Sequence, residues 1–125
     1  MIAPAPALVV DDDPAVARLL AAFLDRMGMA VTVVHDAAGA AAQLASSTFH
    51  LMVTDLELNG RAPGEGLGLL MKCRELQPAC KRILVSGSVG PEVAELVRAH
   101  GGDLFLGKPL TFAELGDAVR SLLDI

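Results

Sequence analysis

The 125-residue sequence contains little cysteine and little positive charge. Its two cysteines, Cys73 and Cys80, lie seven positions apart, which is neither a C-x-x-C pair nor a zinc-ligand spacing. In a chain with enough apolar residues for a core, two thiols indicate a reducing compartment rather than a disulfide framework. Ten Lys and Arg against fifteen Asp and Glu leave a net charge of −5. Because a surface of that sign repels phosphate backbones, we expect no direct nucleic-acid binding by this chain.

Long apolar runs are also missing. No stretch approaches the ~20 apolar residues of a membrane helix, and the start MIAPAPALVV lacks the basic segment and long apolar stretch of a secretory signal. We therefore expect a soluble, cytoplasmic protein with no membrane contact. Hydrophobic residues make up 53% of the chain and charged residues 20%, which favours a packed domain over disorder. The expectation is one domain over residues 1–125, with residues 1–6 as a loosely ordered start.

Short apolar runs alternate with longer segments of helical spacing along the whole chain. The first four runs lack polar alternation, which is typical of strands buried on both faces of a parallel sheet. Gly28 follows the first helical segment, where a glycine can end a helix. The expected strands are Ala7–Val10, Val31–Val34, Leu51–Thr54, Ile83–Ser86 and Leu104–Leu106, and the expected helices are Val16–Met27, Ala37–Ala45, Leu67–Leu76, Pro91–Ala99 and Phe112–Leu123.

Five strand–helix units in alternation predict an α/β fold, with a five-stranded parallel sheet flanked by five helices. The sequence leaves the strand order open. A doubly wound, flavodoxin-like sheet of this size is commonly ordered 2-1-3-4-5 and binds ligands beyond the carboxyl ends of strands 1 and 3. The one irregular stretch is a Gly/Pro-rich loop, Asn59 to Gly66, after the third strand.

Carboxylates directly follow two of these strands. Asp11 and Asp12 follow the first run and Asp55 the third. If strands 1 and 3 are neighbours, the three carboxylates meet in one crevice, where their mutual repulsion favours a bound cation. Oxygen ligands with room left for water suit Mg²⁺, with Mn²⁺ as the alternative. An Asp after a strand can instead cap the next helix, and we prefer that role for Asp13 because Pro14 follows it.

Four segments, LVVDDDP, VTDLEL, ILVSGS and LFLGKPL, each fall at the carboxyl end of an expected strand. Together they resemble the receiver-domain family of two-component response regulators over essentially the whole chain. The resemblance implies a regulatory domain rather than an enzyme, which takes a phosphoryl group onto Asp55 from a histidine kinase or histidine phosphotransfer protein. It also implies that Asp11, Asp12, Asp55 and the backbone carbonyl of Glu57 bind Mg²⁺.

Further roles are implied by the same resemblance. Ser86 matches the hydroxyl residue that hydrogen-bonds the phosphoryl group, and Lys108 matches the lysine of the family, followed by a cis bond to Pro109. Phe105 matches the switch aromatic, often Tyr in the family, although an ordinary core aromatic is an equal alternative. The output surface would comprise the fourth helix, fifth strand and fifth helix. The mixed charges of this surface fit a homodimer interface or a surface that binds a partner. A face that is merely solvated is the preferred alternative.

The sequence also departs from the family pattern. Asn59 stands where the family usually has Pro, and the loop from Asn59 to Gly66, which includes Arg61, is longer than usual. Glu57 adds a carboxylate beside the site, and we expect it to alter metal affinity or water access. The three histidines match no ligand spacing and are interpreted as incidental; they are His35, His50 and His100.

Three other functions compete with this interpretation. A pseudo-receiver, which binds partners without phosphorylation, typically lacks one or more of the site residues that this chain retains. A flavodoxin-like enzyme or nucleotide-binding protein would need a phosphate-binding glycine motif after strand 1, where acidic residues stand instead. A metal-dependent phosphohydrolase with an aspartyl nucleophile also uses clustered Asp, but we expect its D-x-D nucleophile motif to be missing from the first strand. The cognate kinase, and the choice between a stand-alone regulator and the input domain of a longer protein, are left open.

Overall fold

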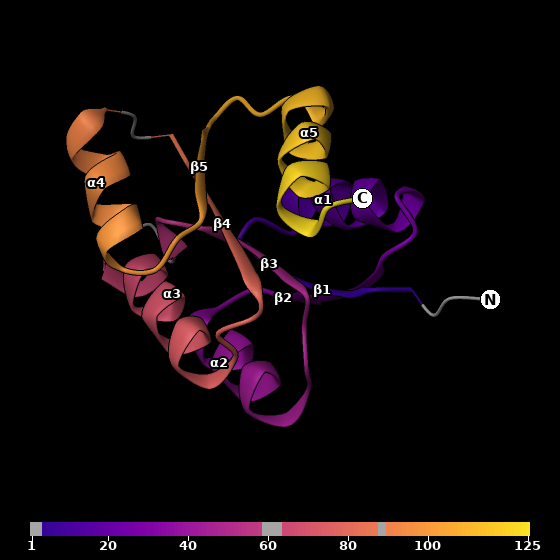
Figure 1. Ribbon diagram of the computed structural model, residues 1–125, viewed down its shortest axis with the longest axis horizontal. Coiled ribbons are helices and arrows are strands. Elements are labelled where there is room, and N and C mark those ends of the chain that lie inside the picture. The colour runs from indigo at the N-terminus through magenta and orange to yellow at the C-terminus, as the bar shows by residue number, and fades with distance from the viewer. Residues whose placement is uncertain (1–3, 59–63, 88–89) are drawn as a thin grey trace.

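The structure is a computed structural model that describes residues 4–58, 64–87 and 90–125. Strands and helices alternate along the chain, as Figure 1 shows. Asn59 and Arg61, the loop residues that departed from the family pattern, lie outside the described residues. The elements are β1 (Pro6–Val10), α1 (Pro14–Arg26), β2 (Ala30–Val34), α2 (Ala37–Ser46), β3 (Leu51–Asp55), α3 (Gly64–Leu76), β4 (Lys81–Ser86), α4 (Pro91–Ala99), β5 (Leu104–Gly107) and α5 (Phe112–Leu123).

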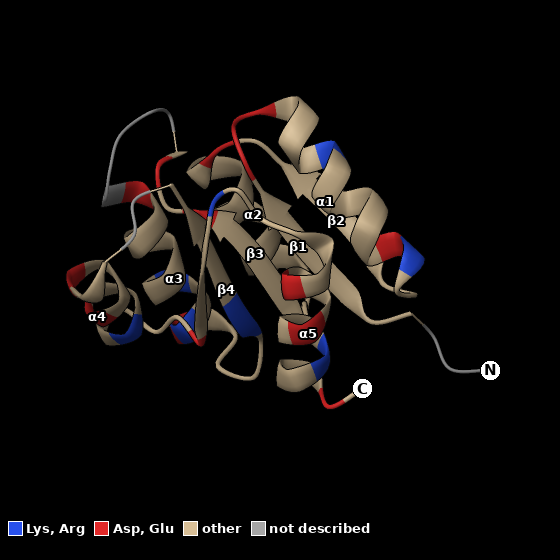
Figure 2. Ribbon diagram, turned by 90° about the horizontal axis from the view of Figure 1, so that it is seen from above, with Lys and Arg blue, Asp and Glu red and all other residues tan. Residues whose placement is uncertain are grey.

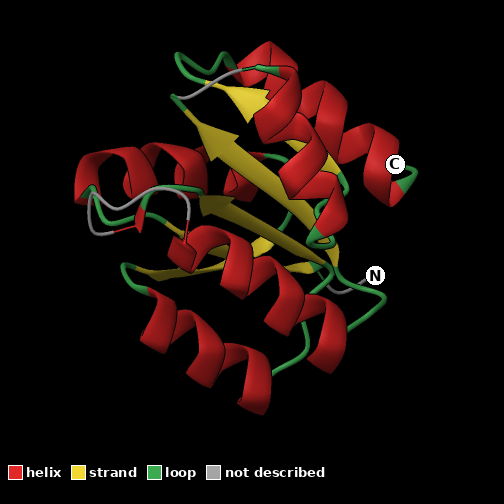
Figure 3. Cartoon of the chain, turned by 90° about the vertical axis from the view of Figure 1, so that its left-hand side faces the viewer, coloured by secondary structure: helices red, strands yellow, loops and turns green. Residues whose placement is uncertain are grey.

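The strands form a parallel sheet in the order β2-β1-β3-β4-β5, which confirms the predicted doubly wound topology. Helices α1 and α5 cover one face of the sheet, and α2, α3 and α4 cover the other (Figures 1 and 3). Val10 at the end of β1 pairs with Val34 of β2 and with Thr54 of β3. The carboxyl ends of these three strands are therefore level, and the residues that follow them emerge at one edge of the sheet.

The sheet divides the interior into two cores. Leu8, Met52 and Leu84 point toward α2, α3 and α4, whereas Val9 and Ile83 point toward α1 and α5. Successive side chains of a strand face opposite sides, so β1, β3 and β4 need apolar residues at nearly every position. Each such Leu, Val or Ile contributes about 1.5–3 kcal/mol when it leaves water completely. Among the described helices, none is both long enough and apolar enough to cross a membrane.

The expectation that the second strand is buried on both faces is wrong. The side chains of β2 are half-buried or exposed, and Val33 retains 36% of its surface. The physical reason is the strand order, because among the described strands β2 pairs only with β1 and lies at the edge of the sheet. The helices that cover the central strands reach only part of an edge strand.

Several element boundaries also differ from expectation, and those of β1 and α3 affect earlier predictions. β1 begins at Pro6, and the carbonyls of Ala5 and Pro6 accept hydrogen bonds from the backbone N–H groups of Ala30 and His50. The expected loose start therefore does not extend to these two residues. Helix α3 begins at Gly64, inside the segment expected to be loop, so residues 64–66 are helical.

Helix α1 runs from Pro14 to Arg26 instead of from Val16 to Met27, but the residues predicted to cap it do so. The Asp13 Oδ1 atom accepts hydrogen bonds from the N–H groups of Ala15 at 3.0 Å and Val16 at 3.4 Å, and Pro14 is the first helical residue. Gly28 follows the last turn with φ +92°, a conformation that favours glycine.

Candidate functional site

Acidic side chains gather at the carboxyl edge of the sheet, where β1 and β3 end side by side. Asp11 follows β1 directly, Asp12 comes next, and Asp55 is the last residue of β3. One oxygen from each of these three carboxylates lies within 4.8 Å of the others. The loop that leads from β1 into α1 is accordingly acidic in Figure 2. The convergence predicted for these three residues is therefore present.

Asp11 is a buried carboxylate held by the chain around it. Its Oδ1 atom accepts a hydrogen bond of 2.9 Å from the backbone N–H of Asp13, and its Oδ2 atom lies 3.9 Å from the Lys108 Nζ atom. Burial raises the pKa of Asp11 above its ordinary value, and the Asp13 N–H and the Lys108 charge offset only part of that rise. Asp12, by contrast, is exposed, so this side of the cluster is open to water.

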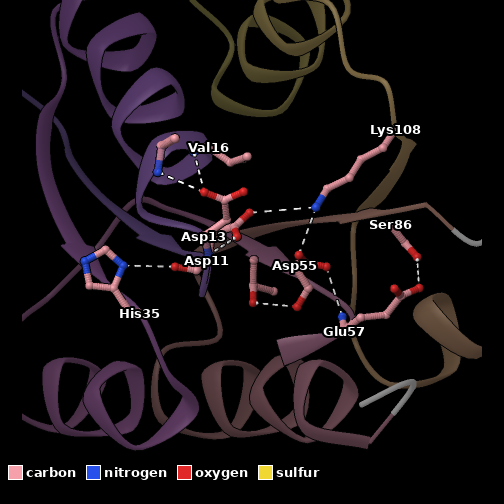
Figure 4. Close-up of polar contacts among 10 residues, drawn as sticks. Asp11, Asp13, Val16, His35, Asp55, Glu57, Ser86 and Lys108 are labelled. Carbon is pink, nitrogen blue, oxygen red and sulfur yellow. Dashed lines mark hydrogen bonds and ion pairs between the residues drawn. The ribbon is translucent and has the colours of Figure 1, made fainter. Parts of the chain in front are cut away.

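Asp55 is also buried, with 6% of its surface exposed, and both of its carboxylate oxygens accept hydrogen bonds. Oδ2 accepts from the Lys108 Nζ atom at 2.9 Å, and Oδ1 accepts from the Glu57 backbone N–H at 3.0 Å. The hydroxyl of Thr54 donates to the Asp55 carbonyl at 3.1 Å. The carboxylate therefore has a fixed orientation toward the open edge of the cluster (Figure 4).

Lys108 reaches the cluster from the end of β5. Its backbone N–H donates to the Ser86 carbonyl at 2.8 Å, which continues the pairing of β4 with β5, and the peptide bond to Pro109 is cis. Burial by itself lowers the pKa of Lys108, but the hydrogen bond and negative charge of Asp55, together with the charges of Asp11 and Glu57, raise it by more. The net effect is a raised pKa, so Lys108 carries its positive charge at neutral pH.

Ser86 and Glu57 are joined by a side-chain contact that sequence reasoning missed. Ser86 is the last residue of β4 and is completely buried, and its Oγ atom donates to the Glu57 Oε1 atom at 3.1 Å (Figure 4). The predictions for Glu57 concern only its backbone carbonyl, as a metal ligand, and the negative charge that its side chain adds beside the site. The contact joins residues 29 positions apart, and no periodicity in the sequence indicates it.

Phe105 lies away from the carboxylates, in the middle of β5. It pairs with Leu84 of β4 and packs against the core beneath α2, α3 and α4. Its half-buried side chain also borders a cavity of about 210 Å³ that Ala94 and Val97 of α4 line on the other side. These surroundings suit both alternatives for Phe105, a core aromatic and an aromatic with room to move.

His35, which was interpreted as incidental, contacts the backbone of the site. His35 follows β2, and its Nδ1 atom lies 3.0 Å from the Asp11 carbonyl oxygen. A carbonyl oxygen can only accept, so Nδ1 carries the proton and donates in this contact. The signal was available, because VTVVH places His35 at the end of a strand next to β1 once the strand order is known.

The expectation that the D-x-D motif of an aspartyl-nucleophile phosphohydrolase is missing after the first strand is wrong, because Asp11 and Asp13 have that spacing. The carboxylate of Asp13 is occupied as the cap of α1, where it accepts from two backbone N–H groups. The Asp13 carboxylate therefore caps the helix and does not act as a general acid in the cluster.

The carboxylate cluster fits a small divalent cation. Mg²⁺ binds oxygens at about 2.0–2.1 Å, so ligands on opposite sides of the ion are roughly 4 Å apart. The mutual separation of the three oxygens, within 4.8 Å, is close to that value. The exposure of Asp12 leaves room for the water ligands that Mg²⁺ retains.

Comparisons with known proteins agree on one family. A family model described as "Response regulator receiver domain" matches residues 7–120. The chain is 34% identical over 116 residues to Protein PetR of Rhodobacter capsulatus, which covers 93% of this chain and 47% of that protein. It is 31% identical over 102 residues to the nitrogen assimilation regulatory protein NtrX of Azorhizobium caulinodans. The matched region covers 82% of this chain and 22% of NtrX. The chain thus spans less than half the length of either relative.

Solved structures of response regulators are also similar to this chain. A CheY-like response regulator receiver domain protein from Methanospirillum hungatei JF-1 has a TM-score of 0.87 and 26% identity, over 97% of this chain and 94% of that one. A response regulator protein from Burkholderia pseudomallei has a TM-score of 0.83 and 27% identity, over 94% and 66% of the two chains. That second structure contains a phosphorylated aspartic acid, a calcium ion and citrate.

Proposed function

The chain belongs to the response regulator receiver domain family, and from that membership and the site geometry we propose that Asp55 accepts a phosphoryl group in a two-component system. The observation that carries the proposal is the Asp55 carboxylate, buried and held by Lys108 at 2.9 Å beside two further carboxylates. The similar B. pseudomallei protein, with its phosphorylated aspartic acid and calcium ion, supports the same chemistry here. The domain would be regulatory and not an enzyme, promoting only its own phosphorylation and dephosphorylation.

In the proposed reaction, an Asp55 oxygen attacks phosphorus, and the bond from phosphorus to the donor histidine nitrogen breaks on the opposite side. The backbone N–H of Glu57 and the ammonium of Lys108 orient the attacking carboxylate. The same ammonium offsets the negative charge of the phosphoryl oxygens, and the Ser86 hydroxyl donates to one of them. Asp11, Asp12, Asp55 and the Glu57 backbone carbonyl would hold Mg²⁺ or Mn²⁺, which when bound further neutralises the phosphoryl oxygens.

The phosphoryl donor would be a histidine kinase or a histidine phosphotransfer protein. An apolar groove of about 270 Å³ lies between α1 and the start of α5, and Lys108 is part of its lining. Leu19 on α1 and Phe112 on α5 border this groove and are 59% and 50% exposed. A partner helix that covers these side chains would bring its histidine to the edge of the carboxylate cluster.

The proposed output surface consists of α4, β5 and α5. Two ion pairs on it are internal to single helices, Arg98 with Glu95 at 3.3 Å and Arg120 with Asp117 at 2.9 Å. Exposed pairs of this kind contribute little to stability. They favour a solvated face in the unphosphorylated state, and a homodimer through this surface stays a prediction. The free thiols of Cys73 and Cys80 support the further proposal of a cytoplasmic location.

Intact-mass spectrometry after incubation with acetyl phosphate tests the proposal. We expect a Mg²⁺-dependent gain of one phosphoryl mass in the wild type and no gain in Asp55→Asn. Wild-type protein that gains no phosphoryl group from acetyl phosphate or from a panel of histidine kinases would contradict the proposal and favour the pseudo-receiver alternative.

A further inference from the structure

The contact between Ser86 and Glu57 connects the expected phosphoryl site to the end of β4. The Ser86 hydroxyl is completely buried and donates to the Glu57 carboxylate at 3.1 Å. The backbone N–H of the same Glu57 donates to the Asp55 carboxylate at 3.0 Å. A single residue therefore touches both the carboxylate that would receive the phosphoryl group and the hydroxyl that would bind it.

A serine hydroxyl has one proton and can donate one hydrogen bond at a time. In this structure the Ser86 hydroxyl donates to Glu57. A phosphoryl group on Asp55 would bring nearly two negative charges and three acceptor oxygens beside the same hydroxyl. Ser86 can serve the phosphoryl group only by leaving the Glu57 carboxylate, and the two anions also repel each other.

The backbone and the side chain of Glu57 have separate tasks. The backbone is anchored by its N–H bond to Asp55, immediately after β3. The contact with Ser86, by contrast, is made by the half-buried side chain of Glu57 and the hydroxyl of Ser86. Exchange of the Ser86 partner is therefore a side-chain movement and needs no change of the fold.

We propose that Glu57 is a positioning residue whose carboxylate holds the Ser86 hydroxyl in the unphosphorylated protein and competes with the phosphoryl group for it. The proposal rests on the proposed function of Asp55 and adds a residue of this chain to it. It predicts that the Glu57 side chain weakens the phosphorylated state and that this effect acts through Ser86.

The first test needs no phosphoryl group. NMR couplings about the Ser86 Cα–Cβ bond report whether the side chain occupies one rotamer. We expect one rotamer in the wild type and in Glu57→Gln, which keeps an acceptor oxygen, and rotamer averaging in Glu57→Ala. The exposed Glu75 of α3 provides the control, because Glu75→Gln changes the net charge equally. Averaging in the wild type, or one unchanged rotamer in Glu57→Ala, would overturn the proposal.

The second test is a double-mutant cycle with beryllofluoride, an analogue of the phosphoryl group, in the presence of Mg²⁺. Glu57→Ala should tighten beryllofluoride binding by about tenfold, the size of one charge-assisted hydrogen bond. In a Ser86→Ala background the same substitution should have a much smaller effect. An equal effect in both backgrounds would mean that Glu57 acts by charge alone, and the proposed competition would be wrong.

The two tests separate this inference from the proposed function. If no variant binds beryllofluoride, the proposed function of Asp55 fails, and the competition with a phosphoryl group is overturned with it. If the wild type binds beryllofluoride but the cycle shows no coupling, the proposed function stands and only the role of Glu57 is withdrawn.

Discussion

At the scale of single residues, Lys108 determines the charge balance of the site. Its ammonium lies 2.9 Å from Asp55 and 3.9 Å from Asp11, both of which are buried. Buried anions are costly unless a cation or hydrogen-bond donors compensate them. The raised pKa of Lys108, in which the carboxylates of Asp55, Asp11 and Glu57 together outweigh the effect of burial, has the same origin. The side chain thus keeps two negative groups together in the absence of a phosphoryl group.

Replacing Lys108 should also slow phosphoryl transfer. We expect Lys108→Ala to slow phosphorylation of Asp55 by acetyl phosphate by roughly 100- to 1000-fold, the usual effect of removing one donor aimed at developing charge. Time-resolved intact-mass spectrometry measures this rate. Lys72→Ala serves as the control, because Lys72 is an exposed residue of α3 with the same charge. A rate equal to that of wild type would exclude Lys108 from the reaction.

At the scale of elements, the first turn of α3 packs directly on the chain segment that leaves β3. A Cβ atom at Gly66 would lie 2.5 Å from the Leu56 carbonyl oxygen and 2.6 Å from the Leu56 Cα atom. Both neighbours are backbone atoms and cannot move aside as a side chain can. Gly66 is therefore required for the close approach of α3 to the segment that also carries Glu57.

Substitutions at two glycines of α3 test this packing. Gly66→Ala should lower the free energy of unfolding by about 1–3 kcal/mol, because the added methyl group forces the helix away from Leu56. At Gly68 a new Cβ atom would have open space around it. Gly68→Ala should therefore raise the free energy of unfolding by roughly 0.5–1 kcal/mol, since glycine weakens a helix. Urea denaturation followed by circular dichroism compares the two variants. Equal effects would show that the close approach is not needed.

At the scale of the whole molecule, the net charge of −5 and the clustered carboxylates oppose folding, and a bound cation relieves that repulsion. Ligands that bind only the folded state stabilise it by mass action. The proposed Mg²⁺ site therefore connects the local chemistry of Asp11, Asp12 and Asp55 with the stability of the entire domain.

Thermal unfolding should report this connection. At ten times its Kd, Mg²⁺ should stabilise the protein by about 1.4 kcal/mol, which raises Tm by roughly 3–6 °C for a domain of this size. NaCl at equal ionic strength is the control for general screening. The shift should be largely lost in Asp12→Asn, because Asp12 is exposed and its replacement leaves the core intact. A shift that NaCl reproduces, or that Asp12→Asn retains, would contradict a specific site.

Features that depend on local patterns could be predicted before the fold was known. Apolar runs such as Leu51 to Thr54 marked the strands, because buried parallel strands need apolar side chains on both faces. Asp13 before Pro14 marked the start of α1, because capping is a contact between residues a few positions apart. The positions of Asp11, Asp55, Ser86 and Lys108 at strand ends were likewise readable from the motifs.

Features that depend on which strands are neighbours, and on where loops turn, could not be predicted from local patterns. The edge position of β2 exposed residues that the apolar pattern had placed inside. The contact of His35 with Asp11 required β2 to lie beside β1, and that of Glu57 with Ser86 required the β3–α3 segment to turn toward β4. Such contacts join residues 24 and 29 positions apart, beyond the reach of any helical or strand period. They form when the sheet assembles, because the packing of the whole chain sets their geometry.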